Sequence, residues 1–179
     1  DTLVSIQNVN TGAGNDTIWG SSTTNVINSG AGSDTIFANA GNNTIYAGSG
    51  VDIIYGGTGE DSIFGEEGND YIFASAGADI IDGGANSDLV DYSDSSTGIN
   101  LTLLDSGATV NVSHNIDGVA SDDRLTNIEG IKGSTTASNT LIGNNMNNTL
   151  IGGDLTDIIK GVSGNNSLNG GAGNDTIFA

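Results

Sequence analysis

A nine-residue pattern of polar and apolar positions runs without interruption from Thr11 to Asp91. Six small or polar positions precede three positions centred on a β-branched residue, which reads Ile18, Ile27, Ile36, Ile45, Ile54, Ile63, Ile72, Ile81 and Val90. This pattern predicts a turn followed by a short strand whose central side chain points inward. One such unit is too small to bury an apolar side chain alone, so we expect the units to stack on one another.

The sixth position of each repeat carries a carboxylate or its amide: Asp16, Asn25, Asp34, Asn43, Asp52, Asp61, Asp70, Asp79 and Asp88. Small residues fill the positions before it, among them Gly12, Gly14, Gly30, Gly32, Gly48, Gly50, Gly57, Gly59 and Gly68. Stacked strands lie about 4.8 Å apart, so neighbouring carboxylates on one edge would repel each other by about 3 kcal/mol at an effective dielectric of ~20. A calcium ion between the turns converts this repulsion into attraction, because Ca²⁺ takes about six to eight oxygen ligands from carboxylates and carbonyls.

Glycine allows the unusual backbone angles that aim several carbonyls at one point.

These units resemble the glycine- and aspartate-rich nonapeptides of the RTX (repeats-in-toxin) family, strongly over residues 11–91 and less well over 133–179. The resemblance implies an all-β fold, a right-handed parallel β-roll in which two nonapeptides form one coil. Turns eighteen residues apart then lie above one another, so one edge stacks the turns of Asp16, Asp34, Asp52, Asp70 and Asp88. The other edge stacks the turns of Asn25, Asn43, Asp61 and Asp79.

The resemblance also implies where calcium binds. Each ion would lie between two stacked turns, with the sixth-position Asp bridging neighbouring ions and carbonyls of the first four positions completing the shell. We expect four sites between successive Asp residues of the first edge and one between Asp61 and Asp79. Asn25 and Asn43 supply no charge, so sites there should be weak or absent. The simpler alternative is that these Asp and Asn side chains only cap their own turns.

Three segments are expected along the chain. Residues 1–91 form the first block, and residues 92–132 form an irregular, strand-rich insertion that continues the roll as a widened coil. Residues 133–179 form a second block, in which Asp157 and Asp175 lie eighteen residues apart and could make one more site. Asn139, Asn148 and Asn166 make the rest of this block poor in calcium ligands.

Composition narrows the possible partners. The chain has 22 acidic and 3 basic residues and a formal charge of −19, which argues against nucleic acid and anionic membrane surfaces and favours cations. There is no cysteine, and His114 is the only histidine, so a nucleophile–base pair or a zinc site lacks its residues. Paired carboxylates could serve glycosidase chemistry, but metal binding already explains their number and register. We therefore expect no catalytic residues and no membrane insertion.

Aromatic residues occupy the ninth position on one predicted sheet, at Trp19, Phe37, Tyr55 and Phe73. These four side chains should form a row on an outer face. The row could stabilise itself through contacts between neighbours. Alternatively, it could be a docking surface for a flanking domain, a second copy of the chain or a sugar polymer.

The resemblance implies a calcium-binding module of a larger secreted bacterial protein. Type I secretion would export it unfolded, and it would fold on calcium outside the cell, in the medium or at the cell surface. It could serve as a structural or adhesin-type segment. It could instead be the accessory module of an extracellular enzyme, similar to those of mannuronan epimerases, lipases or proteases, and bind anionic polysaccharide or its own catalytic domain. An ice-binding module is a minor alternative. Such a surface would need a regular row of Thr and Asx residues along the turn edge, and only Thr58 occupies the third position of a repeat.

Overall fold

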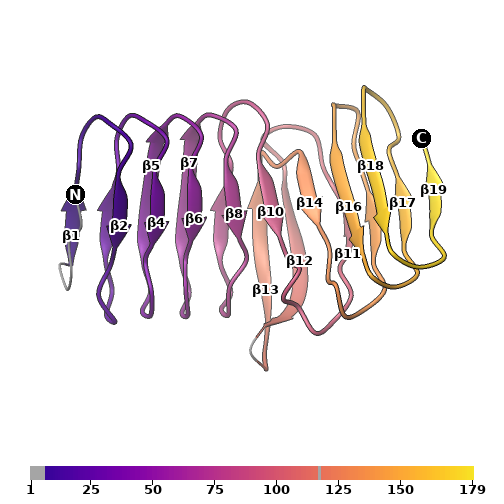
Figure 1. Cartoon of the computed structure of the whole chain (residues 1–179), viewed down its shortest axis with the longest axis horizontal. Helices are drawn as coiled ribbons and strands as arrows, with labels where there is room; N and C mark the ends of the chain where they lie inside the picture. Colours follow the sequence, from indigo (N-terminus) through magenta and orange to yellow (C-terminus); the bar gives the residue numbers. More distant parts are fainter. Residues whose placement is uncertain (1–6, 117) are drawn as a thin grey trace.

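Each nonapeptide folds as a turn followed by a short strand, and the strands stack into a β-solenoid (Figure 1). The computed structural model describes residues 7–116 and 118–179. Within this part of the chain there is no helix, and hence none long and apolar enough to cross a membrane. The all-β fold and the parallel stacking predicted from the repeat are confirmed.

The described strands form three sheets along the solenoid. The eight-stranded sheet follows the order β18 (Ser167–Gly171), β16 (Thr149–Gly153), β14 (Gly130–Lys132), β10 (Leu89–Asp91), β8 (Tyr71–Phe73), β6 (Ile53–Tyr55), β4 (Thr35–Phe37) and β2 (Thr17–Trp19). The seven-stranded sheet follows the order β1 (Asn8–Asn10), β3 (Val26–Asn28), β5 (Thr44–Ser49), β7 (Ser62–Glu67), β9 (Ile80–Asp82), β13 (Val119–Thr126) and β12 (Thr109–Ile116). The four-stranded sheet consists of β11 (Asn100–Thr102), β15 (Thr140–Ile142), β17 (Ile158–Lys160) and β19 (Thr176–Phe178).

The strand register confirms that two nonapeptides make one coil. Ile36 pairs with Ile18 on one side and with Ile54 on the other, each eighteen residues away. The eighth-position side chains therefore lie in single file between the two sheets, and Ile18 to Ile81 and Val90 have no exposed surface. One hydrophobic core extends in this way from Val9 to Ile159.

The insertion continues the eight-stranded sheet but ends the seven-stranded one. Strand β14 pairs with β10, so Ile131 takes the place beside Val90 that a nonapeptide residue would hold. On the other side β13 pairs in parallel with β9 and in antiparallel with β12. This antiparallel hairpin interrupts the parallel stacking within the insertion. Its cause is the alternating pattern of β12, which buries Val112, His114 and Ile116 on one face.

We expect the core to depend on the eighth position and not on the seventh. Ile54 is fully buried, whereas the adjacent Ile53 is 39% exposed. Replacing Ile54 by Ala should lower the free energy of unfolding by about 2–5 kcal/mol, because it removes buried methylenes and leaves a cavity. Ile53→Ala is the matched control and should cost much less. Denaturant unfolding of both variants in saturating calcium measures the difference, and equal losses would contradict this assignment of the core.

Candidate calcium sites in the turns

The sixth-position side chains form a ladder along each edge of the solenoid. On the first edge, Oδ1 of each Asp accepts a hydrogen bond from the sixth-position N–H of the preceding coil. The bonds run from Asp16 to Asp34 (2.7 Å), Asp34 to Asp52 (2.7 Å), Asp52 to Asp70 (2.9 Å) and Asp70 to Asp88 (2.8 Å). The same bond joins Asn25 to Asn43, Asn43 to Asp61, Asp61 to Asp79 and Asp157 to Asp175. The structure thus brings together all the Asp residues that the sequence predicted to stack.

The second carboxylate oxygen is different, because several of these atoms are buried without a hydrogen-bond donor. Among the described residues this holds for Oδ2 of Asp34, Asp52, Asp61, Asp70 and Asp88. Each of these side chains belongs to a residue that is 2% exposed or less. A buried carboxylate oxygen with no donor is strongly disfavoured unless a cation lies against it. These five carboxylates therefore fit turns that hold a cation against the second oxygen.

A glycine at the first position of the turn makes room for that ligand. Asp70 Oδ2 and the carbonyl oxygen of Gly83, in the next coil, face the same point beside Gly65, where a Cβ would lie 2.4 and 2.5 Å from them. Beside Gly152 the same pair of groups recurs, with Asp157 Oδ2 at 2.3 Å and the carbonyl oxygen of Gly170 at 2.5 Å. The turn thus encloses a small space lined by oxygen atoms.

Asn43 shows which oxygens line this space, because its amide nitrogen lies where the orphaned oxygen lies in an Asp turn. Its Nδ2 donates to the carbonyl of Gly41 at 2.9 Å, to that of Gly56 in the next coil at 3.4 Å and to that of Asn39 at 3.5 Å. In this turn the amide protons supply the positive charge density that the carbonyls need. In the Asp turns the same carbonyls face an anionic side chain, and a hard cation with oxygen ligands suits that set.

The predicted glycines all adopt left-handed backbone angles, with φ between 93° and 145°: Gly12, Gly14, Gly30, Gly32, Gly48, Gly50, Gly57, Gly59 and Gly68. Stacking also requires their small size, since a Cβ on Gly68 would lie 1.5 Å from the Gly50 carbonyl oxygen. Some of their carbonyl oxygens accept hydrogen bonds from the next coil, and Ala31 N–H donates to the Gly12 carbonyl at 2.7 Å. These carbonyls keep a second lone pair for another partner.

Main-chain oxygens must supply most of any coordination shell. Within residues 7–116 and 118–179, no three acidic or histidine side chains converge on one point. A shell of one or two carboxylates completed by several carbonyls is typical of calcium rather than of zinc, which prefers nitrogen and sulfur ligands.

The family comparison agrees with this geometry. The sequence matches the RTX calcium-binding nonapeptide repeat over residues 7–36, 28–63, 55–90, 134–154 and 151–179, which together cover most of the chain. The chain belongs to the RTX family. No curated protein matches it. The RTX repeats are calcium-binding structural modules, which makes calcium the cofactor of this chain.

Burial favours the protonated, neutral form of the RTX carboxyl groups when no ion is bound. Desolvation raises the pKa of Asp52, Asp79 and Asp88 from 3.8 to about 7, and that of Asp61 and Asp70 to about 6. Neighbouring carboxylates raise the pKa further, as Asp70 and Asp34 do for Asp52. Without calcium, the folded chain therefore holds protons that the unfolded chain releases.

The sequence did not predict the two acidic residues of the insertion that extend the RTX ladders. Asp123 Oδ1 accepts the N–H of Asp79 at 2.9 Å, and Glu129 Oε2 accepts the N–H of Asp88 at 3.1 Å. Neither residue lies in a nonapeptide, and each is more than forty positions away from its partner. No spacing in the sequence could have identified them.

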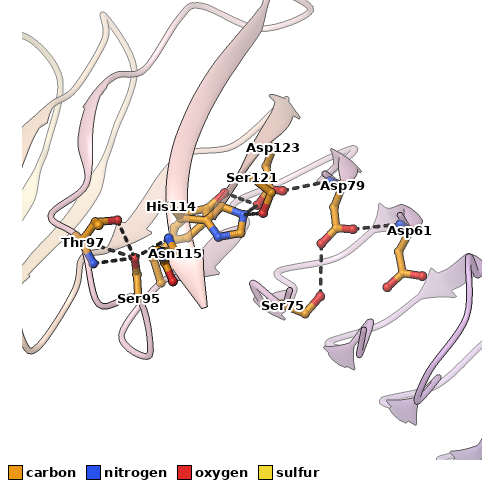
Figure 2. A network of polar contacts seen from close by, with 10 residues as sticks. Asp61, Ser75, Asp79, Ser95, Thr97, His114, Asn115, Ser121 and Asp123 are labelled. Atoms are coloured by element: carbon orange, nitrogen blue, oxygen red, sulfur yellow. Dashed lines mark hydrogen bonds and ion pairs between the residues drawn. The ribbon is translucent and has the colours of Figure 1, made fainter. Parts of the chain in front are cut away.

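Asp123 also anchors a buried polar cluster (Figure 2). His114 Nε2 lies 3.0 Å from Asp123 Oδ2, and the Tyr92 hydroxyl donates to the same oxygen at 2.9 Å. The side chains of His114 and Asp123 have no exposed surface. The histidine thus stabilises the junction of the insertion with the first block.

The predicted aromatic row is present on the outer face of the eight-stranded sheet. Successive ring centroids are 5.6 Å apart for Trp19 and Phe37, 4.7 Å for Phe37 and Tyr55, and 4.1 Å for Tyr55 and Phe73. Neighbouring rings are within about 11° of parallel. The faces of the inner rings are thus covered by their neighbours.

The raised pKa values predict that protons can partly replace calcium in this RTX fold. A carboxyl whose folded pKa is about 6–7 and whose unfolded pKa is 3.8 stabilises the calcium-free fold at low pH, and this contribution disappears as pH rises through about 7. In chelator, the β signal in circular dichroism should therefore increase as pH falls from about 8 to about 5. The calcium-saturated protein is the control and should not change over this range. A β signal that decreases on acidification in chelator would contradict the prediction.

Proposed function

We propose that this chain is a calcium-dependent folding module of a larger secreted protein, disordered at the low calcium of the cytoplasm and folded outside the cell. The row of orphaned, buried carboxylate oxygens carries the proposal, because it makes the folded state costly without a cation. An ion that binds the folded chain and not the unfolded one stabilises the fold by mass action. A disordered chain also suits passage through a type I secretion channel.

The ligands in this proposal come from the stacked turns. Ions lie between successive members of the Asp16, Asp34, Asp52, Asp70 and Asp88 row, between Asp61 and Asp79, and between Asp157 and Asp175. Each sixth-position Asp bridges two ions where it has turns on both sides. Carbonyls of the turn glycines and of the next coil complete each shell.

The folded module serves best as a stiff structural or adhesin-type segment. The aromatic row supports this role, because parallel rings that cover each other hold neighbouring coils together. A surface for sugar binding would need free ring faces, and among the four rings Trp19 at the end of the row is the most open, at 36% exposed. Ice binding is disfavoured, since the third positions of the first edge are Ala13, Ala31, Ser49, Glu67 and Ala85 and form no regular threonine row.

An accessory role beside a catalytic domain is the second candidate. It is favoured by the pocket of about 270 Å³ at the end of the aromatic row, where Tyr55 and Phe73 meet Ile116 of the insertion. In that role the pocket and the exposed ring edges would contact a flanking domain or an anionic polysaccharide.

A calcium titration followed by circular dichroism tests the folding switch. The wild-type chain should gain β signal cooperatively with calcium and not with magnesium. Asp52→Asn should create a turn like that of Asn43, lose two bound ions and shift the calcium midpoint several-fold upward, while folding more readily in chelator. Asp94→Asn, at an exposed position outside the repeats, is the charge-matched control and should behave as wild type. A chain that is fully folded in chelator at neutral pH would contradict the proposal.

The two roles of the aromatic row can be separated by one substitution. Phe37→Ala removes two ring contacts and should lower the free energy of unfolding in calcium by about 1–3 kcal/mol. Phe178→Ala is the control, because that ring is 53% exposed and lies in the last strand. If Phe37→Ala leaves stability unchanged but abolishes retention on an alginate column, the row is a docking surface instead.

A further inference from the structure

The ladder of the first edge does not end at the last nonapeptide of the first block. Asp88 N–H donates to Glu129 Oε2 at 3.1 Å, just as Asp70 N–H donates to Asp88 Oδ1 at 2.8 Å. Glu129 is only 7% exposed, and strand β14 directly after it pairs with β10 in the continuous eight-stranded sheet. The glutamate therefore occupies the place of a sixth-position Asp in the next coil.

The space enclosed at this junction matches that of a nonapeptide turn. Asp88 Oδ2 and the carbonyl oxygen of Asn127 lie 2.5 and 2.4 Å from the point where a Cβ on Gly83 would be. At Gly65 the corresponding distances are 2.4 Å to Asp70 Oδ2 and 2.5 Å to the Gly83 carbonyl oxygen. Asn127 thus presents the carbonyl that the first-position glycine presents elsewhere.

The backbone of Asn127 is held in the conformation that this requires. Its φ of 52° lies in the left-handed region, which asparagine tolerates better than most residues. The side chain fixes it there, with Nδ2 donating to Asp82 at 2.8 Å and Oδ1 accepting the N–H of Gly107 at 2.7 Å. The carbonyl is therefore positioned by built-in contacts.

An unsatisfied atom points to a ligand at this place. Asp88 is 1% exposed, and its Oδ2 has no hydrogen-bond partner among the described residues. The corresponding end of the second edge offers the contrast, since at Asp79 and Asp123 the protein supplies the donors itself. Ser75 donates to Asp79 Oδ2, and His114 Nε2 lies 3.0 Å from Asp123 Oδ2 (Figure 2). The Tyr92 hydroxyl also donates to Asp123 Oδ2.

We propose that Asp88, Glu129 and the main-chain carbonyl of Asn127 form a further calcium site, outside the nonapeptide repeats. It rests on the calcium-dependent fold proposed above and adds one ion to the six Asp–Asp turn pairs. Because two of its ligands come from the insertion, this ion ties residues 127–129 to the last turn of the first block. Calcium that bridges Asp88 and Glu129 therefore stabilises the docking of the insertion onto the first block.

Counting bound ions tests the site. Native mass spectrometry at saturating calcium should show one ion fewer in Glu129→Gln than in wild type. The glutamine keeps the size of the side chain and an oxygen that accepts the Asp88 N–H, and it removes only the charge. Asp122→Asn is the matched control, because it removes an exposed charge from the same segment and should bind the wild-type number of ions.

A purely structural role for Glu129 predicts a different result. In that case Glu129→Gln would bind the wild-type number of ions, and this outcome would overturn the site. Circular dichroism adds a second readout: the substitution should raise the calcium midpoint but leave folding in chelator unchanged or improved. Equal destabilisation with and without calcium would also overturn it.

A folding failure and a failure of the underlying proposal can both be recognised. If Glu129→Gln does not fold in calcium, Glu129→Asp replaces it in the test. The aspartate keeps the charge but places it one methylene farther from Asp88. That variant should show a weaker last binding step in calorimetry, and an unchanged titration would overturn the site. If wild type binds no calcium, the calcium-dependent fold itself is wrong. If wild type binds calcium and both Glu129 variants match it, only the additional site is wrong.

Discussion

Burial of carboxylates in the stacked turns is the constraint on which this structure depends. On the first edge, one oxygen of Asp34, Asp52, Asp70 and Asp88 accepts an N–H from the preceding coil, which sets the spacing and register of the stack. The other oxygen lies against carbonyls in a space that a side-chain atom would fill. At Asp34, Asp52, Asp61, Asp70 and Asp88 no donor among the described residues reaches that second oxygen, so a cation there would stabilise the ladder.

The hydrophobic core alone cannot replace this interaction. Each strand of the first block buries one side chain fully, and a single file of isoleucines separates the two sheets. Such a core favours stacking but buries little apolar surface per coil, and ordering a glycine-rich chain costs more entropy than usual. The turns must therefore contribute stability of their own. If calcium drives folding as proposed, this explains why repeats of this composition fold and yet require an external ion.

The sequence could predict every feature that depends on the eighteen-residue period. The inward isoleucines, the stacked Asp turns and the row from Trp19 to Phe73 all follow from one register. The features it could not predict depend on contacts without a period. Asp123 and Glu129 reach Asp79 and Asp88 across more than forty residues, through a hairpin whose pairing partner the sequence does not reveal. The role of His114 was likewise hidden, because a buried imidazole is recognised only once the carboxylate beside it is known.

The choice between Asp and Asn at the sixth position then decides how strongly each part of the solenoid depends on calcium. An Asp turn whose second oxygen has no donor favours a cation, whereas Asn43 donates to a carbonyl of its own turn through Nδ2. In the second block, Asn139 donates to Ser134 and Asp157, and Asn148 donates to Asn144. These turns replace ion–carbonyl contacts with amide–carbonyl and amide–side-chain bonds that are present at any calcium concentration. The proposed calcium requirement therefore falls mainly on the carboxylate row from Asp16 to Asp88 in the first block and less on the amide turns of the second block.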